Sequence, residues 1–239
     1  MGNDRMARLA SPVNSSMRSS LARVTVRVGS VIALSASALS ASRAPSPQAP
    51  FTEEAAARGI SYLTIESPAA GRGVALVDLD DDGDADFLAV GNPTSLVALL
   101  ENDGSGVFTD RAPASGLPLI SSGSGIAGAD LDGDGDVDLM VSRWLAPNML
   151  LRNDGNFQFS EVGATAGIDD GWNGTGCAIG DYDLDGRLDI YASNYNEGFP
   201  VVANRLYRNL GGLTFVDVAP ALGVAETSTL TLQARFVDI

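Results

Sequence analysis

The chain has 239 residues, with 15 basic and 30 acidic side chains, a formal net charge of −15 and 45% hydrophobic residues. It contains no histidine, and all of its basic residues are arginines, so neither the commonest general acid–base side chain nor a Schiff-base lysine is available. A surface this acidic repels nucleic acid and anionic membranes. Composition therefore disfavours those partners, and the length predicts one or two domains.

The first 50 residues differ from the rest in charge, because they hold six arginines and a single acid. From Met17 they follow the order of a secretory signal, with three arginines, the mostly apolar stretch Val28–Leu39 and a cleavage candidate at Ala36–Ala38. An organelle transit peptide is the alternative. The apolar stretch is too short for a membrane span. We therefore expect a secretory leader over residues 1–44, a proline-rich linker over 45–50, and a secreted, extracellular or periplasmic protein.

The remainder, residues 51–239, repeats with a period near 50 residues, which indicates an array of supersecondary units. Short apolar runs bounded by turn residues predict strands. In the first unit they are Gly73–Asp78, Asp86–Val90 and Leu96–Leu100, followed by a turn at Glu101–Gly104 into Val107 and Phe108. We expect each such phenylalanine to end an outer strand and the Ala/Gly-rich tail after it to cross to the next unit. Four strands per unit is typical of a propeller blade, so the predicted class is all-β.

An aspartate-rich loop recurs between the first two predicted strands of each unit, beginning at Asp78, Asp130 and Asp181. Each copy places carboxylates at positions 1, 3, 5 and 9 around a glycine at position 6, which permits a sharp turn. Hard oxygen donors in a flexible loop suit Ca²⁺, which takes about 6–8 oxygen ligands. The predicted side-chain ligands are Asp78, Asp80, Asp82 and Asp86; Asp130, Asp132, Asp134 and Asp138; and Asp181, Asp183, Asp185 and Asp189.

Position 7 is predicted to offer its backbone carbonyl, which explains why an arginine is accepted there. The residues concerned are Asp84, Asp136 and Arg187. An EF-hand would need a bidentate glutamate at position 12. That position holds Ala89, Val141 and Ala192. The remaining alternative is an acidic hairpin turn that binds nothing, and the recurrence of the pattern favours Ca²⁺ at about three sites.

The loops lie inside a longer pattern, Gly-x-Ala-x-x-Asp-x-Asp-x-Asp-Gly-x-x-Asp, over residues 73–86, 125–138 and 176–189. A second signature follows the later loops at Asn148–Gly155 and Asn204–Gly211. The first pattern resembles the FG-GAP/VCBS repeats, which are the blades of integrin-alpha-type β-propellers. The combination of both is similar to the cartilage acidic protein and ASPIC/UnbV group.

This resemblance implies a partial β-propeller of about three to four four-stranded blades, each with a calcium-loop hairpin. The first repeat departs from the second signature, with Val97 in place of the asparagine. Phe236–Ile239 opens a fourth copy, in which Asp238 is the first aspartate. We therefore expect an N-terminal fragment that is truncated in the fourth repeat, with the remaining blades of the full-length protein as partners.

The resemblance also implies a function, namely a secreted, non-catalytic module that binds a protein or carbohydrate ligand or mediates adhesion. The sequence has no Gly-x-Ser-x-Gly elbow, phosphate loop or His/Cys zinc set. The alternative is a calcium-dependent polysaccharide lyase or hydrolase whose site lies in missing blades. The acids that could form a glycosidase pair are Glu66, Glu101, Glu161, Glu197 and Glu226.

Three smaller features have a packing and a functional interpretation. The small residues of the inner strands either allow close packing or line a ligand channel. Cys177 is either a buried small hydrophobe or a reactive thiol. Trp144 and Trp172 either cover blade edges or contact sugar or protein. We favour the packing interpretation in each case.

Overall fold

The computed structural model describes residues 52–60, 73–91, 97–168, 173–195, 202–227, 231 and 234–237. These residues all fall within one compact unit, Ala49–Val237. The predicted leader and linker lie outside the described residues, as do Phe51, Glu66, Trp172, Glu197 and Asp238.

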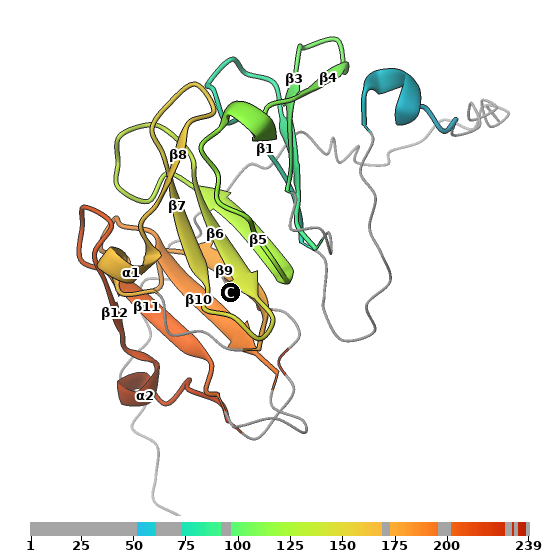
Figure 1. Ribbon diagram of the computed structural model, residues 1–239. Coiled ribbons are helices and arrows are strands. Elements are labelled where there is room, and N and C mark those ends of the chain that lie inside the picture. The colour runs from blue at the N-terminus through green and yellow to red at the C-terminus, as the bar shows by residue number, and fades with distance from the viewer. Residues whose placement is uncertain are drawn as a thin grey trace, which may run out of the picture. The chain divides into compact units, whose positions relative to one another are not determined.

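Three four-stranded antiparallel sheets make up most of the described chain, and in each the strands are ordered as they follow in sequence (Figure 1). The first sheet contains β1 (Val74–Val77), β2 (Asp86–Ala89), β3 (Ala98–Asn102) and β4 (Phe108–Asp110). The second contains β5 (Gly123–Ala129), β6 (Asp138–Arg143), β7 (Met149–Asn153) and β8 (Phe159–Glu161). The third contains β9 (Gly174–Gly180), β10 (Asp189–Asn194), β11 (Arg205–Asn209) and β12 (Phe215–Asp217). The all-β class and the four-stranded, blade-like unit are confirmed.

Two details of the predicted strands are wrong. The third strand of the first unit runs on to Asn102, so the turn begins later than Glu101. Glu101 pairs with Thr109 and Asn102 with Phe108. The Asp86 carboxylate also holds the backbone N–H of Asn102, which keeps this residue in the strand. Phe108 begins an outer strand instead of ending one, and so do its counterparts in the other two sheets.

Short helical turns lie in the Ala/Gly-rich tails. They are η1 (Ala56–Arg58), η2 (Ala112–Ala114), α1 (Gly163–Ala166) and α2 (Ala219–Leu222). Three of the four end at a glycine in the left-handed conformation, which terminates a helix at little cost. None of the helices in the described part of the chain is long and apolar enough to cross a membrane.

Neighbouring sheets pack on each other through alternate residues of the second sheet. Leu139 belongs to a buried cluster shared with Leu88 and Leu99 of the first sheet. Met140, the next residue, belongs to a second cluster with Ile190 and Tyr207 of the third sheet. Because side chains alternate along a strand, β6 is apolar on both faces and its residues Asp138–Ser142 are buried. Position 2 of each of the first two aspartate loops, Leu79 and Leu131, lies in these same clusters, so the core anchors the loops.

The inner strand β5 contacts both β1 and β9. A Cβ atom added to Gly125 would lie 2.7 Å from the Cα of Gly176, and one added to Gly73 would lie 2.7 Å from the carbonyl carbon of Gly125. Side chains do not fit at such separations, so the glycines allow the inner strands to approach. This supports the packing interpretation of the small residues.

Cys177 and Trp144 also support that interpretation. Cys177 packs against the second core cluster, and burial raises the pKa of its thiol to about 11, which keeps the thiol protonated. Trp144 is buried and meets Tyr195 edge-on, with ring centroids 5.4 Å apart.

Candidate metal centres

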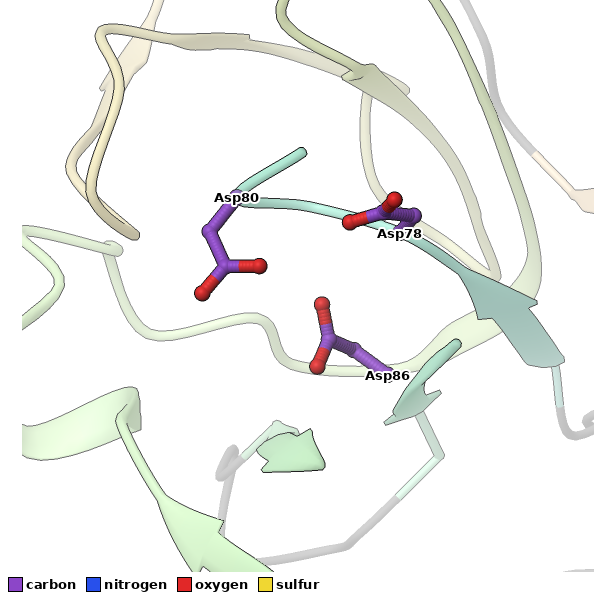
Figure 2. A group of neighbouring side chains, drawn as sticks. All are labelled: Asp78, Asp80 and Asp86. Carbon is purple, nitrogen blue, oxygen red and sulfur yellow. The ribbon is translucent and has the colours of Figure 1, made fainter. Parts of the chain in front are cut away.

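Each aspartate loop joins the first strand of a sheet to the second, so its ends are fixed by a strand pair. In the first loop, one carboxylate oxygen from each of Asp78, Asp80 and Asp86 lies within 4.8 Å of the others. Figure 2 shows these three carboxylates turned toward a common space. The same group of three recurs in the other loops, as Asp130, Asp132 and Asp138, and as Asp181, Asp183 and Asp189. The structure therefore brings together positions 1, 3 and 9 of all three loops.

The position 1 carboxylate folds the loop around itself. The Asp78 oxygens accept backbone N–H bonds from Asp82 at 3.2 Å and from Gly83 at 2.9 Å. Asp181 does the same with Asp185 at 3.1 Å and Gly186 at 2.9 Å. The glycine at position 6 is needed because its φ is positive, +93° at Gly83, a conformation that side chains disfavour.

The position 9 carboxylate is fully buried and accepts two backbone N–H bonds. Asp138 accepts one from Asn153 at 2.9 Å and one from Leu131 at 3.2 Å. Burial raises the pKa of Asp138 to about 7, against the lowering effect of these two bonds. The same burial raises the pKa of Asp86 and of Asp189. A nearby cation would offset the penalty of keeping these buried groups ionised.

Position 3 carries the clearest sign of a missing charge partner. The Oδ1 atom of Asp80 is buried, with no hydrogen-bond partner. Burial raises the pKa of Asp80, and repulsion from Asp82 raises it further. An unpaired carboxylate oxygen inside a ring of carboxylates is the environment that a hard cation requires. The residues present therefore fit a calcium ion.

Position 5 does not join the group of three. The Oδ1 atom of Asp82 accepts the backbone N–H of Asp84 at 2.9 Å, and that of Asp134 accepts the N–H of Asp136 at the same distance. Asp185 accepts the N–H of Arg187 at 3.0 Å. Asp82, Asp134 and Asp185, together with the position 7 carbonyls, thus remain predicted ligands.

The third loop differs in its charge partners. The Arg208 guanidinium lies 2.8 Å from an oxygen of Asp183 and 3.2 Å from an oxygen of Asp185. The side chain of Arg187 also contacts Asp185 and donates from Nε to the Asn209 carbonyl at 2.9 Å. Burial would raise the pKa of Asp185, but the Arg187 N–H and the two guanidinium groups bring it below its ordinary value. The prediction gave Arg187 only a carbonyl role and missed Arg208.

Sequence reasoning also missed three asparagines next to the loops, the partly buried Asn102 and the fully buried Asn153 and Asn209. The sequence placed Asn102 in a predicted turn and Asn153 and Asn209 in the second signature, without a role toward the loops. Each donates its backbone N–H to the position 9 carboxylate of its own sheet, at 2.8 to 2.9 Å. The earlier asparagines of the signature have a different task. The Oδ1 atom of Asn148 accepts the N–H of Arg143, and that of Asn204 accepts the N–H of Asn194, which closes the second hairpin of the second and third sheets.

The described glutamates of the glycosidase hypothesis make local bonds. Glu101 accepts from Arg111 Nε at 2.6 Å, Glu161 accepts from the N–H of Gly163 at 2.8 Å, and Glu226 accepts from the N–H of Thr227 at 2.9 Å.

Comparison with known proteins agrees with these repeats. Residues 78–141 and 144–192 match the FG-GAP-like repeat family. The chain is 30% identical to mouse cartilage acidic protein 1 over 178 residues, which is 68% of this chain and 26% of the relative. It is 30% identical to the human protein of that name over 197 residues, 75% of this chain and 28% of the relative. The chain thus spans about a quarter of the length of these relatives.

Among the solved structures similar to this chain is one described as an Agrocybe aegerita lectin that recognises non-reducing terminal N-acetylglucosamine. It is 21% identical, with a TM-score of 0.38, and the match covers 61% of this chain and 36% of that one.

Proposed function

We propose that this chain of FG-GAP-like repeats is a secreted, calcium-binding module that binds a protein or carbohydrate ligand without catalysis. The observation that carries the calcium part is the threefold recurrence of one carboxylate group, with positions 1, 3 and 9 converging in every loop. An acidic turn that binds nothing would not be expected to bury one carboxylate and place two others beside it in all three loops, because the three charges repel one another. In this proposal Ca²⁺ stabilises each hairpin.

The ligand set we propose extends the group of three. Position 5 would contribute its second carboxylate oxygen, and position 7 its carbonyl, which brings each loop close to the coordination number that Ca²⁺ favours, about 6–8. Bound calcium would relieve the repulsion that raises the pKa of Asp80 and Asp132 in addition to burial. Affinity on the order of 10⁻⁴–10⁻³ M is expected, as in extracellular modules.

The secreted location rests on two observations. The predicted leader over residues 1–44 has the order of a secretory signal. The similar proteins are named for cartilage, which favours an extracellular setting over the periplasm. Extracellular Ca²⁺ is concentrated enough to fill loops of millimolar affinity. With a net charge of −15, the chain is not suited to bind nucleic acid.

Thermal unfolding with and without calcium tests the stabilising role. In about 5 mM Ca²⁺, each site of the expected affinity adds roughly 1–2 kcal/mol to the free energy of unfolding. Three sites should therefore raise Tm by about 10–20 °C relative to EDTA, and calorimetric titration should report about three ions. The matched control is the triple variant D80N/D132N/D183N, which should lose most of the shift. An unchanged Tm together with no heat of binding would contradict the proposal.

A second experiment separates binding from catalysis. Calcium-loaded protein is incubated with immobilised polysaccharides and matrix proteins, and both retention and the release of new chain ends are measured. We expect calcium-dependent retention on at least one surface with no release of fragments. Calcium-dependent release of fragments would contradict the non-catalytic assignment.

A further inference from the structure

A continuous series of buried hydrogen bonds joins the three loops. Within each sheet, the position 9 carboxylate accepts one bond from position 2 of its own loop and one from the asparagine that ends the third strand. For Asp86 these donors are the backbone N–H groups of Leu79 and Asn102, both at 2.8 Å. For Asp189 they are the N–H groups of Tyr182 at 3.0 Å and Asn209 at 2.8 Å.

Two of the asparagines also reach the preceding sheet. The Nδ2 atom of Asn153 donates to the carbonyl of Leu79 at 3.0 Å, and that of Asn209 donates to the carbonyl of Leu131 at 2.8 Å. Leu79 and Leu131 are position 2 of the preceding loops. Each asparagine therefore touches two loops, its own through its backbone and its neighbour through its side chain.

These groups are almost completely removed from water. Asn153, Asn209 and Asp138 are 0% exposed, and Leu79 and Leu131 are 1% and 4% exposed. A buried amide that loses its partner pays its full desolvation penalty, and hydrogen bonds in such surroundings are strong and directional. A change in the position of one carbonyl is therefore passed to the asparagine that binds it.

We propose that Asn153 and Asn209 are positioning residues that couple neighbouring metal loops, so that an ion in one loop raises the metal affinity of the next. The proposal rests on the proposed calcium function. An ion held by Asp130, Asp132 and Asp138 fixes the segment between them, including the carbonyl of Leu131. That carbonyl orients Asn209, whose backbone N–H orients the carboxylate of Asp189 in the third loop.

Asn102 shows what the asparagine does without the link. Its Nδ2 atom donates to the carbonyl of Ala85 in its own loop, at 3.1 Å. Asn209 makes the equivalent local bond to Leu188, at 3.0 Å, in addition to the one that crosses between sheets. The Oδ1 atom of Asn102 also accepts the N–H groups of Gly104 and Gly106, as that of Asn209 accepts the N–H of Gly211. The variant N102S therefore removes only bonds within one sheet and serves as the matched control for N209S.

Terbium can read the third loop selectively, because Tb³⁺ replaces Ca²⁺ and its emission is sensitised by a nearby tyrosine. Tyr182 is position 2 of the third loop, where the other loops have leucine. The full chain would be titrated with Tb³⁺ as wild type, as the second-loop variant D130N/D132N, as N209S, and as the combination. Y182F checks that the emission comes from this loop, and the metal-free Tm of N209S and N102S checks the fold.

When Asn209 is present, we expect D130N/D132N to weaken Tb³⁺ binding at the third loop at least fivefold, which is a typical size for coupling between two sites. In N209S, the same double substitution should weaken Tb³⁺ binding less than about twofold. If N209S does not fold, N209D replaces it in the experiment. An aspartate keeps the oxygen that accepts the N–H of Gly211 and lacks the Nδ2 group that donates to the Leu131 carbonyl. If D130N/D132N and wild type bind Tb³⁺ at the third loop equally well, the coupling is overturned. If D130N/D132N weakens this binding as much in N209S as in the wild-type background, the role of Asn209 is overturned. Wild-type protein without sensitised emission would instead overturn the calcium function itself.

Discussion

The first and third loops share one backbone plan but have opposite surroundings. In the first loop, the described residues bring no ion pair to Asp80, whose Oδ1 atom is buried without a partner. In the third loop, the Arg208 guanidinium lies 2.8 Å from Asp183, the equivalent residue. The carboxylates of one loop therefore depend on a bound ion for neutralisation, while those of the other already face a cation of the protein.

Besides Arg187 inside the third loop, the difference comes from the position that precedes the asparagine at the end of the third strand of each sheet. It is Glu101 in the first sheet, Arg152 in the second and Arg208 in the third. Arg152 does not reach its loop, because it pairs with Asp154 at 2.6 Å, whereas the third sheet has Leu210 in the place of that aspartate. A side chain outside the loop thus contributes to how much of the loop's charge is already neutralised.

Removal of the position 3 charge should separate the two loops most clearly. D80N removes an unpaired ligand, and we expect calcium binding at the first loop to weaken about 100-fold, since affinity follows the number of ligand charges. D183N removes a carboxylate that Arg208 already holds, and we expect a loss of about tenfold. Calorimetric titration measures both. Equal losses would mean that Arg208 leaves its carboxylates when calcium binds.

Burial raises the pKa of the position 9 carboxylate in all three loops, so calcium binding should depend on pH. The second loop is the one to test, through Asp138. Burial raises the pKa of Asp138 from 3.8 to about 7. Without metal, this group's contribution to stability is full below pH 3.8 and is lost as the pH rises through about 7. A proton competes with calcium for the carboxylate, so binding at the second loop should weaken about tenfold from pH 8 to pH 6.

Calorimetry at both pH values measures this change. D138N is the control, because it removes the titrating group and binds little calcium at that loop at either pH. Binding by the wild-type second loop that does not change between these pH values would contradict the prediction.

The shared parts of the sheets could be predicted from sequence because they are local. Apolar runs flank each aspartate loop, so the strands and hairpins follow from the pattern, and the 1-3-9 group follows from the spacing. The strand ends were less accurate. Asn102 stays in β3 because a carboxylate 16 residues earlier holds its N–H.

The contacts that distinguish the loops could not be predicted, since they join residues far apart in sequence. Asn153 binds a carbonyl 74 residues earlier, and Arg208 binds a carboxylate 23 residues earlier. Arg152 and Arg208 occupy equivalent positions and differ only in whether an aspartate follows two residues later. The presence or absence of this aspartate is visible in the sequence. Only the structure shows that Arg152 pairs with Asp154, whereas Arg208 pairs with Asp183 of the loop.

The variant R208M should make the third loop resemble the first. It frees Asp183 and Asp185 from the guanidinium, and we expect calcium affinity at the third loop to rise about fivefold, as one positive charge leaves the site. The control is R152M at the equivalent position, where the arginine pairs outside the loop and the change should stay below about twofold. Terbium emission from Tyr182 measures the third loop. Equal effects of both variants would show that net charge alone matters.

The reverse exchange, E101R, tests whether one position is enough to convert the first loop. Glu101 is paired with Arg111, so its own charge is already largely neutralised and its removal should matter little. The control E101Q should therefore change calcium binding at the first loop less than about twofold.

An arginine at position 101 is different, because the first sheet also has an aspartate two residues later, Asp103, as the second sheet does. Asp103 is held by the N–H groups of Ser105 and Val107, at 2.9 and 3.1 Å, so its carboxylate is only partly free to bind the new guanidinium. We expect E101R to weaken calcium binding at the first loop about threefold. The new arginine would then neutralise more of its loop's charge than Arg152 does in the second sheet, and less than Arg208 does in the third. In E101R/D103L, which copies the third sheet, calcium binding should weaken further. If both variants bind calcium as the wild type does, the charge before the asparagine does not set the affinity of the loop.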